Sequence, residues 1–115
     1  MSQLDHLVPK LEAIPGVEQV TIADASGAHL AGSEAEGAEE FAATVTYVGQ
    51  TGTTIQDAMS LDDFNHVLLS GKKDKLLVYA IAEDYLGMRL SAQAIVSKVE
   101  TSVASLLASV QGDED

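Results

Sequence analysis

The sequence predicts an α+β fold, in which a five-stranded, mainly antiparallel sheet carries helices on both faces. Three observations lead to this prediction. Three segments show apolar residues at helical spacing, five shorter segments have the apolar composition of strands, and turn residues separate the strands within each group. The expected order is helix, strand, strand, helix, strand, strand, strand, helix, because strands joined by short turns pair antiparallel with their neighbours.

The first helix is followed by a hairpin. Apolar spacing over residues 3–13 predicts a helix that ends before Gly16. Pro9 lacks a backbone donor and crowds the turn before it, so we expect a kink or a late start in this helix. Residues 17–24 and 27–32 then predict two short strands joined by a tight turn.

The second predicted helix is intrinsically weak. An apolar stripe runs from Phe41 to Met59 in steps of four and three residues, and Glu39 and Glu40 lie in the first turn, where carboxylates complement the helix dipole. Threonine and glycine fill many of the remaining positions, each costing up to about 1 kcal/mol relative to alanine. We therefore expect packing on more than one side to hold this helix.

Three strands and a helix complete the predicted fold. The strands cover residues 64–70, 75–82 and 85–90, and the continuous apolar run in the middle strand indicates that both its faces are covered. Ser91 is the expected N-cap of the last helix, because serine accepts a hydrogen bond from a first-turn amide. The apolar stripe of that helix runs over residues 96–110.

The chain length and composition predict a single domain. The sequence has no cysteine, no apolar run of the roughly 20 residues that a membrane helix needs, and no secretory signal at its start. We expect one cytoplasmic domain over residues 1–111, followed by a disordered acidic tail at residues 112–115.

The charge balance restricts the possible partners. The net charge of −12 disfavours nucleic acid and anionic membrane surfaces as partners, because both are themselves negatively charged. Two interpretations of the acidity stay open. It keeps a small protein soluble, or it attracts a basic patch on a partner.

We expect no catalytic residue, metal site or cofactor. The three histidines, His6, His29 and His66, lie on different predicted elements and lack the spacing of metal ligands. Glu83 and Asp84 fall where two strands must turn. The sequence has no thiol, no serine elbow and no glycine-rich phosphate loop. We therefore expect a protein that acts through its surface and is not an enzyme.

Arg89 is the only arginine in the chain. An arginine supplied in trans can stabilise phosphoryl transfer on another protein, so such a role is conceivable. Its expected position late in a central strand argues against that role.

The strand predicted at residues 64–70 is the feature that indicates an interaction with another chain. It contains no lysine, proline or glycine, so at the edge of a sheet it would be a template for pairing with another chain. It also follows the helix that needs additional packing. Together these features predict a two-fold dimer through this strand and the second helix, whereas a strand inside the sheet would be fully paired already. The residues expected at the dimer interface are Gly49, Gly52, Phe64, His66, Val67, Leu68 and Leu69.

Several stretches of the sequence carry a family pattern. They are residues 14–17 at the end of the first helix, 20–24, 26–27 and 30–31 in the first hairpin, and 76–81 and 86–90 in the later strands. With the long second helix, they resemble the Roadblock family, the dynein light-chain type of small module, over nearly the whole chain. Pro9 in the first helix departs from this pattern.

The resemblance implies a homodimer with one sheet running across both subunits, and a Ras-like small GTPase as partner. In the similar bacterial mutual-gliding B proteins, a dimer stimulates a GTPase and supplies no catalytic side chain. The partner would be regulated or scaffolded by the outward side of the second helix, where Tyr47 is a candidate anchor if it is not covered by the second subunit. The residues placed on this partner surface are Thr44, Tyr47, Val48, Thr51 and Thr54.

A different class of function remains as an alternative. A module similar to PAS or profilin-like sandwiches would sense a small molecule in an interior pocket. Ala80, Ala82 and Gly87 are the small residues that could line such a pocket.

Overall fold

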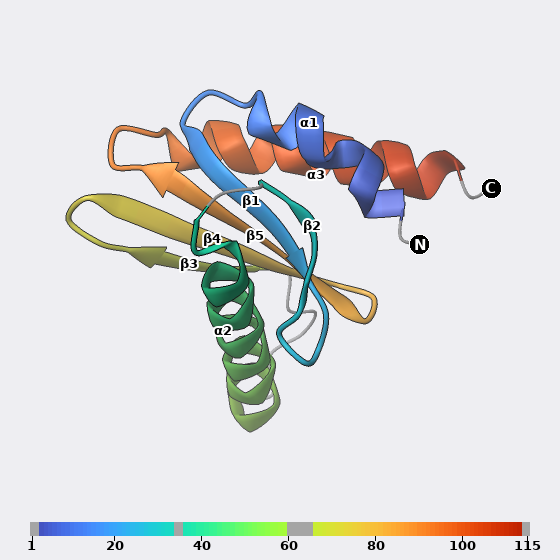
Figure 1. Ribbon diagram of the computed structural model, residues 1–115, viewed down its shortest axis with the longest axis vertical. Coiled ribbons are helices and arrows are strands. Elements are labelled where there is room, and N and C mark those ends of the chain that lie inside the picture. The colour runs from blue at the N-terminus through green and yellow to red at the C-terminus, as the bar shows by residue number, and fades with distance from the viewer. Residues whose placement is uncertain (1–2, 34–35, 60–65, 114–115) are drawn as a thin grey trace.

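The computed structural model describes residues 3–33, 36–59 and 66–113. Its strands form one antiparallel sheet in the order β2-β1-β5-β4-β3, with α1 and α3 on one face and α2 on the other (Figure 1). The predicted fold class and element order are confirmed. The elements are η1, a 3-10 helix (Gln3–Leu7), α1 (Val8–Glu12), β1 (Val17–Ala23), β2 (His29–Gly32), α2 (Ala38–Met59), β3 (His66–Ser70), β4 (Asp74–Ile81), β5 (Asp84–Ser91) and α3 (Val96–Asp113).

Pro9 gives the first helix a late start. The α-helix α1 begins at Val8, so Pro9 lies in its first turn, where the missing amide hydrogen is not needed for a helical bond. The preceding residues form the separate 3-10 helix η1. The single helix predicted over residues 3–13 is therefore two short helical pieces, with Leu7 and Leu11 buried in the core.

Ser91 does not cap the last helix, so this prediction is wrong. Ser91 is the final residue of β5, where it pairs with Asp74, and its amide donates to the carbonyl of Gly16 at 2.8 Å. These contacts keep residue 91 in the sheet, and α3 starts only at Val96. At its other end α3 continues to Asp113, into the predicted tail, and residues 114–115 lie outside the described part of the chain.

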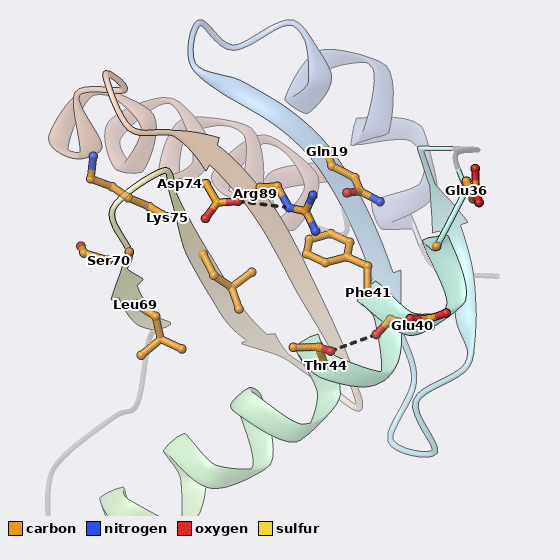
Figure 2. Close-up of a pocket in the computed structure, with 13 residues that line it drawn as sticks. Gln19, Glu36, Glu40, Phe41, Thr44, Leu69, Ser70, Asp74, Lys75 and Arg89 are labelled. Carbon is orange, nitrogen blue, oxygen red and sulfur yellow. Dashed lines mark hydrogen bonds and ion pairs between the residues drawn. The ribbon is translucent and has the colours of Figure 1, made fainter.

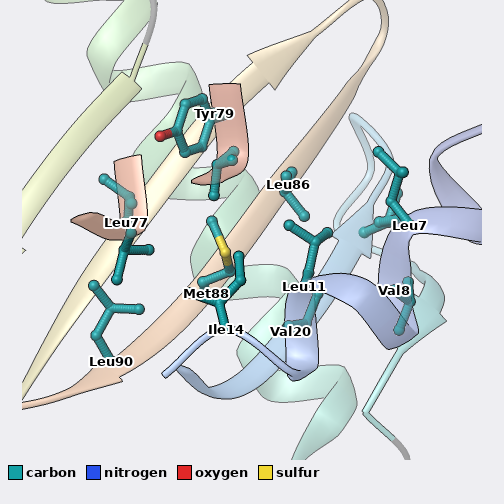
Figure 3. Close-up of a cluster of buried hydrophobic side chains, with 13 residues drawn as sticks. Leu7, Val8, Leu11, Ile14, Val20, Leu77, Tyr79, Leu86, Met88 and Leu90 are labelled. Carbon is teal, nitrogen blue, oxygen red and sulfur yellow. The ribbon is translucent and has the colours of Figure 1, made fainter. Parts of the chain in front are cut away.

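The larger core lies between the sheet and the helices α1 and α3 (Figure 3). Alternate strand residues point to this face, as the two-residue period of a strand requires. Leu77, Leu86 and Met88 are fully buried there, together with Val99 and Val103 of α3. Burying a leucine of this kind contributes about 2 kcal/mol to stability, so this layer is the main hydrophobic support of the sheet.

The opposite face of the sheet packs closely against α2. Phe41, Val45 and Val78 form the small core on this side. A Cβ atom at Gly87 would lie only 2.2 Å from Val45 Cγ2. Val45 therefore fills the space that an interior pocket at Gly87 would need, and the expectation of a pocket there is wrong.

Only the first half of α2 is covered by its own sheet. Val45 and Gly49 are buried, but the helix continues beyond the strands (Figure 1), and the side chains of Ile55 and Met59 are 49% and 65% exposed. The apolar stripe predicted from Phe41 to Met59 therefore exists, but the chain buries only part of it.

Gly87→Ala tests the close approach of α2 to β5. The added methyl group would overlap the Val45 side chain, so we expect a loss of about 1–3 kcal/mol in the free energy of unfolding. Urea unfolding of the variant measures this loss. The double variant Val45→Ala/Gly87→Ala is the matched control, because removing the Val45 methyl groups makes room for the new one. Wild-type stability in the single variant would contradict the proposed contact.

Candidate protein-interaction surface

β3 lies at one edge of the sheet, as predicted. It pairs with β4, with Val67 opposite Val78 and Leu68 opposite Leu77, so Val67 faces the α2 side and Leu68 the α3 side. Leu68 and Leu69 are 39% and 50% exposed. Phe64, predicted in the same strand, lies outside the described residues. The edge thus combines an outer backbone that no described strand pairs with and exposed leucines.

A polar contact ties this edge strand to α3. His66 Nε2 lies 2.6 Å from Glu100 Oε2, and the His66 ring lies against Tyr79, with 4.9 Å between ring centroids. Burial, with a contribution from the negative charge of Glu100, raises the pKa of Tyr79 to about 12. These contacts hold the start of β3 in register with the sheet on its α3 face.

The middle of α2 carries no charge, and the exposed Glu40 and Asp57 lie just beyond either end of this stretch. Residues 41–56 lack any charged side chain, although 21% of all residues in the chain are charged. Four exposed residues follow one another here at helical spacing, and we call them the α2 ridge. Tyr47, in its middle, is 71% exposed. The ridge consists of Thr44, Tyr47, Thr51 and Thr54.

A second stripe runs beside the ridge. This stripe, which we call the α2 flank, consists of Val48, Gly52, Ile55 and Met59. Val48, also predicted on the partner surface, is half-buried and packs against the small core beside Leu76. The ridge and the flank are thus two neighbouring stripes of one helix, and they differ in how far their side chains are covered.

α2 and β3 border a common hollow of about 560 Å³ (Figure 2). Thr44 lines it from the helix, Leu69 from the edge strand and Leu76 from β4. Charged side chains line it as well, namely Glu36, Glu40, Asp74, Lys75 and Arg89. The hollow therefore joins the edge of the sheet to the start of α2, where Thr44 is the only ridge residue that lines it.

Gly49 does not belong to that surface. It is buried, and a Cβ atom there would lie 2.3 Å from Cδ1 of Tyr85 in the same chain. The absence of a side chain at this position therefore serves packing within the subunit, whereas the sequence led us to expect Gly49 at the dimer interface. Gly52, one turn further on, is also buried.

Arg89 lies on the central strand β5, as predicted, and its side chain lines the hollow (Figure 2). Its guanidinium stands 5.2 Å from the centroid of the Phe41 ring, and its Nε atom is 3.8 Å from Asp74 Oδ2. A cation over an aromatic face is attracted by the ring quadrupole. Both contacts hold the guanidinium against the sheet.

Two further polar residues considered in the sequence for a metal or catalytic role, His29 and Asp84, lie within the sheet or at one of its turns. His29 Nδ1 lies 2.8 Å from Thr21 Oγ1, inside the contact between β1 and β2. Asp84 follows a hairpin turn, and desolvation and neighbouring carboxylates raise its pKa. In the described ranges no three His, Cys, Asp or Glu side chains gather as a metal site would require, and no helix there could cross a membrane.

Comparisons with known proteins agree on the fold. A family model described as the Roadblock/LC7 domain matches residues 3–87. A Roadblock/LC7 domain from Streptomyces avermitilis superposes with a TM-score of 0.83 at 18% identity, over 96% of this chain and 97% of the other. MglB of Myxococcus xanthus gives 0.79 at 11% identity (91% and 89% covered), and the gliding protein MglB of Thermus thermophilus gives 0.74 at 17% (87% and 79% covered). No curated protein matches the sequence.

Glu100→Gln tests the effect of the α3 carboxylate on Tyr79 of β4. The pKa of Tyr79 lies above its ordinary value of 10.0, so the stability gained from the neutral phenol is complete below pH 10.0 and is lost as the pH rises to about 12. Removing the charge of Glu100 leaves the burial, so we expect the pKa to fall only part of the way to its ordinary value. Phenolate absorbance during an alkaline titration measures this, with Tyr79→Phe identifying the signal. An unchanged pKa would show that Glu100 does not act on Tyr79.

Proposed function

This chain belongs to the Roadblock/LC7 domain family, and from this membership and its surface we propose that it is a homodimeric module that binds a Ras-like small GTPase and regulates or scaffolds it. Roadblock/LC7 domains are typically non-catalytic regulatory modules, and MglB, which it resembles in structure, is a small-GTPase regulator. We place this activity in the cytoplasm.

The uncharged α2 ridge is the observation that carries the proposal. Interface centres are depleted of charged residues and enriched in tyrosine relative to the rest of a protein surface. In a chain with a net charge of −12, residues 41–56 have that composition, and Tyr47 stands 71% exposed among threonines. Such a surface favours a protein partner over a charged small molecule.

The edge strand and the α2 flank support the dimer. An unpaired edge without charge or proline invites a further strand, and a two-fold axis beside β3 would place the same strand of a second copy there. The flank would meet its own copy across the same axis, which would cover Ile55 and Met59. The proposed interface thus adds Ile55 and Met59, and also Val48, which the sequence placed on the partner surface. The residues kept from the sequence prediction are Gly52, Phe64, His66, Val67, Leu68 and Leu69.

The contacts of Arg89 bear on whether it could act as a catalytic arginine on a bound GTPase. Phe41 and Asp74 hold its guanidinium against the sheet, so we propose no trans-acting arginine. The module would instead act by the shape of the surface that it offers to the GTPase.

We do not propose the alternative function of sensing a small molecule. One of the three residues that suggested a pocket, Gly87, has no free space beside it, because Val45 occupies that space.

Leu69→Lys tests the dimer. A lysine at this edge position would place a charge in the proposed interface, so we expect the protein to change from a dimer to a monomer. Leu30→Lys is the matched control, because Leu30 is 48% exposed and Leu69 50%, and Leu30 lies on β2 at the opposite edge. Light scattering measures the molar mass. A monomeric wild type, or two dimeric variants, would contradict the interface.

Tyr47→Ala tests the partner surface. An exposed aromatic anchor that becomes buried in a complex contributes enough that its loss weakens binding by about 30-fold. Binding to Ras-like GTPases from the same genome is measured by calorimetry, with the exposed Ile95 of the α3 side changed to alanine as control. We expect Tyr47→Ala to remain a dimer. A variant that loses the dimer would instead place Tyr47 against the second subunit.

A further inference from the structure

Every threonine of the α2 ridge has its hydroxyl bonded within its own helix. Thr44 Oγ1 donates to the carbonyl of Glu40 at 3.0 Å, and Thr51 Oγ1 to that of Tyr47 at 2.8 Å. Thr54 Oγ1 donates in the same way to the carbonyl of Gln50 at 3.1 Å. In each case the acceptor lies four residues earlier, so the hydroxyl turns to the backbone and the γ-methyl group is left for the surface.

The side-chain amide of Gln50, which lies beside the ridge, is also hydrogen-bonded within the chain. Gln50 Nε2 donates to the carbonyl of Ala25 at 3.0 Å, which joins α2 to the turn after β1. The Tyr47 hydroxyl is the one polar side-chain group of the ridge that bonds to none of the residues that the structure describes. The ridge therefore presents methyl groups and one phenol ring, although its sequence is rich in polar residues.

This composition is unfavourable for the helix itself. Threonine is a weak helix former, and a hydroxyl bonded to the carbonyl four residues back slightly destabilises a helix. Exposed positions of helices are better filled by alanine, glutamate or lysine. The same hydroxyl bonds fix the threonine side chains in one orientation, which reduces the conformational entropy lost when a partner covers them.

We propose that the α2 ridge recognises its partner through the methyl groups of Thr44, Thr51 and Thr54 around the Tyr47 ring, and that the partner presents an uncharged patch of aliphatic and aromatic side chains. The inference rests on the proposed function, since it specifies the chemistry by which the GTPase is bound. The threonine hydroxyls act within the helix, where they hold the methyl groups in place, and make no bond to the partner.

Two triple variants separate the methyl groups from the hydroxyls. Thr44→Val/Thr51→Val/Thr54→Val keeps the branched shape and removes the hydroxyls, whereas the corresponding serine variant keeps the hydroxyls and removes the methyl groups. Valine, serine and threonine have similar helix propensities, so both variants retain comparable helices. Circular dichroism and light scattering confirm folding and oligomeric state before binding is measured.

The probe is the Ras-like GTPase of the same genome that binds the wild type. We expect the valine variant to bind within about threefold of the wild type, and the serine variant about tenfold or more weaker, because each buried methyl group contributes to the transfer free energy. A valine variant that binds as weakly as the serine variant would overturn the inference while leaving the proposed function intact. Equal affinity of all three proteins would do the same, by removing the threonines from the contact.

Two further outcomes are informative. If the wild type binds no GTPase of the panel, the proposed function fails and this inference fails with it. In the unbound protein, three-bond couplings to the threonine Cγ2 atoms report the side-chain orientation. One orientation at residues 44, 51 and 54 supports the inference, and averaging among several overturns it.

Discussion

The structure depends on the close contact between α2 and the central strand β5. At this contact the Val45 side chain occupies the space above Gly87, and the ring of Tyr85 occupies the space beside Gly49, so each glycine makes room for one side chain of the opposite element. A packed interior cannot absorb an added methyl group there without moving the helix. The first half of α2 is thereby fixed, and its second half extends past the strands towards solvent.

This position gives α2 three different faces. The first is buried on the sheet, the α2 flank lies beside it and remains partly exposed, and the α2 ridge points outward. The edge strand β3 borders the same hollow as Thr44 at the start of the ridge. The α2 ridge itself is uncharged, whereas the chain as a whole is strongly acidic and the hollow is lined in part by charged side chains such as Glu40 and Lys75. The low helix propensity of α2 is explained if its exposed residues are suited to binding partners and only its buried residues are suited to its own core.

Local sequence patterns predicted the helices and strands well, because these elements form through interactions between residues that are close in sequence. Apolar spacing indicated the helices and strands, and the geometry of proline indicated the late start of α1. The errors concern residues whose partners are distant in sequence. Ser91 is held in β5 by Gly16 and Asp74, and the small size of Gly49 is required by Tyr85, far along the chain. Nothing in the neighbourhood of either residue indicates such a partner.

The order of the elements, the composition of an edge strand without charge, and the charge-free stretch of α2 were determined by the sequence alone, because periodicity and composition need no knowledge of neighbours. The strand order that leaves β3 at the edge, the assignment of each glycine to a contact, and the separation of ridge from flank were decided only by the tertiary structure. The physical reason is that these properties are relations between surfaces, and a surface exists only after distant segments have packed against each other.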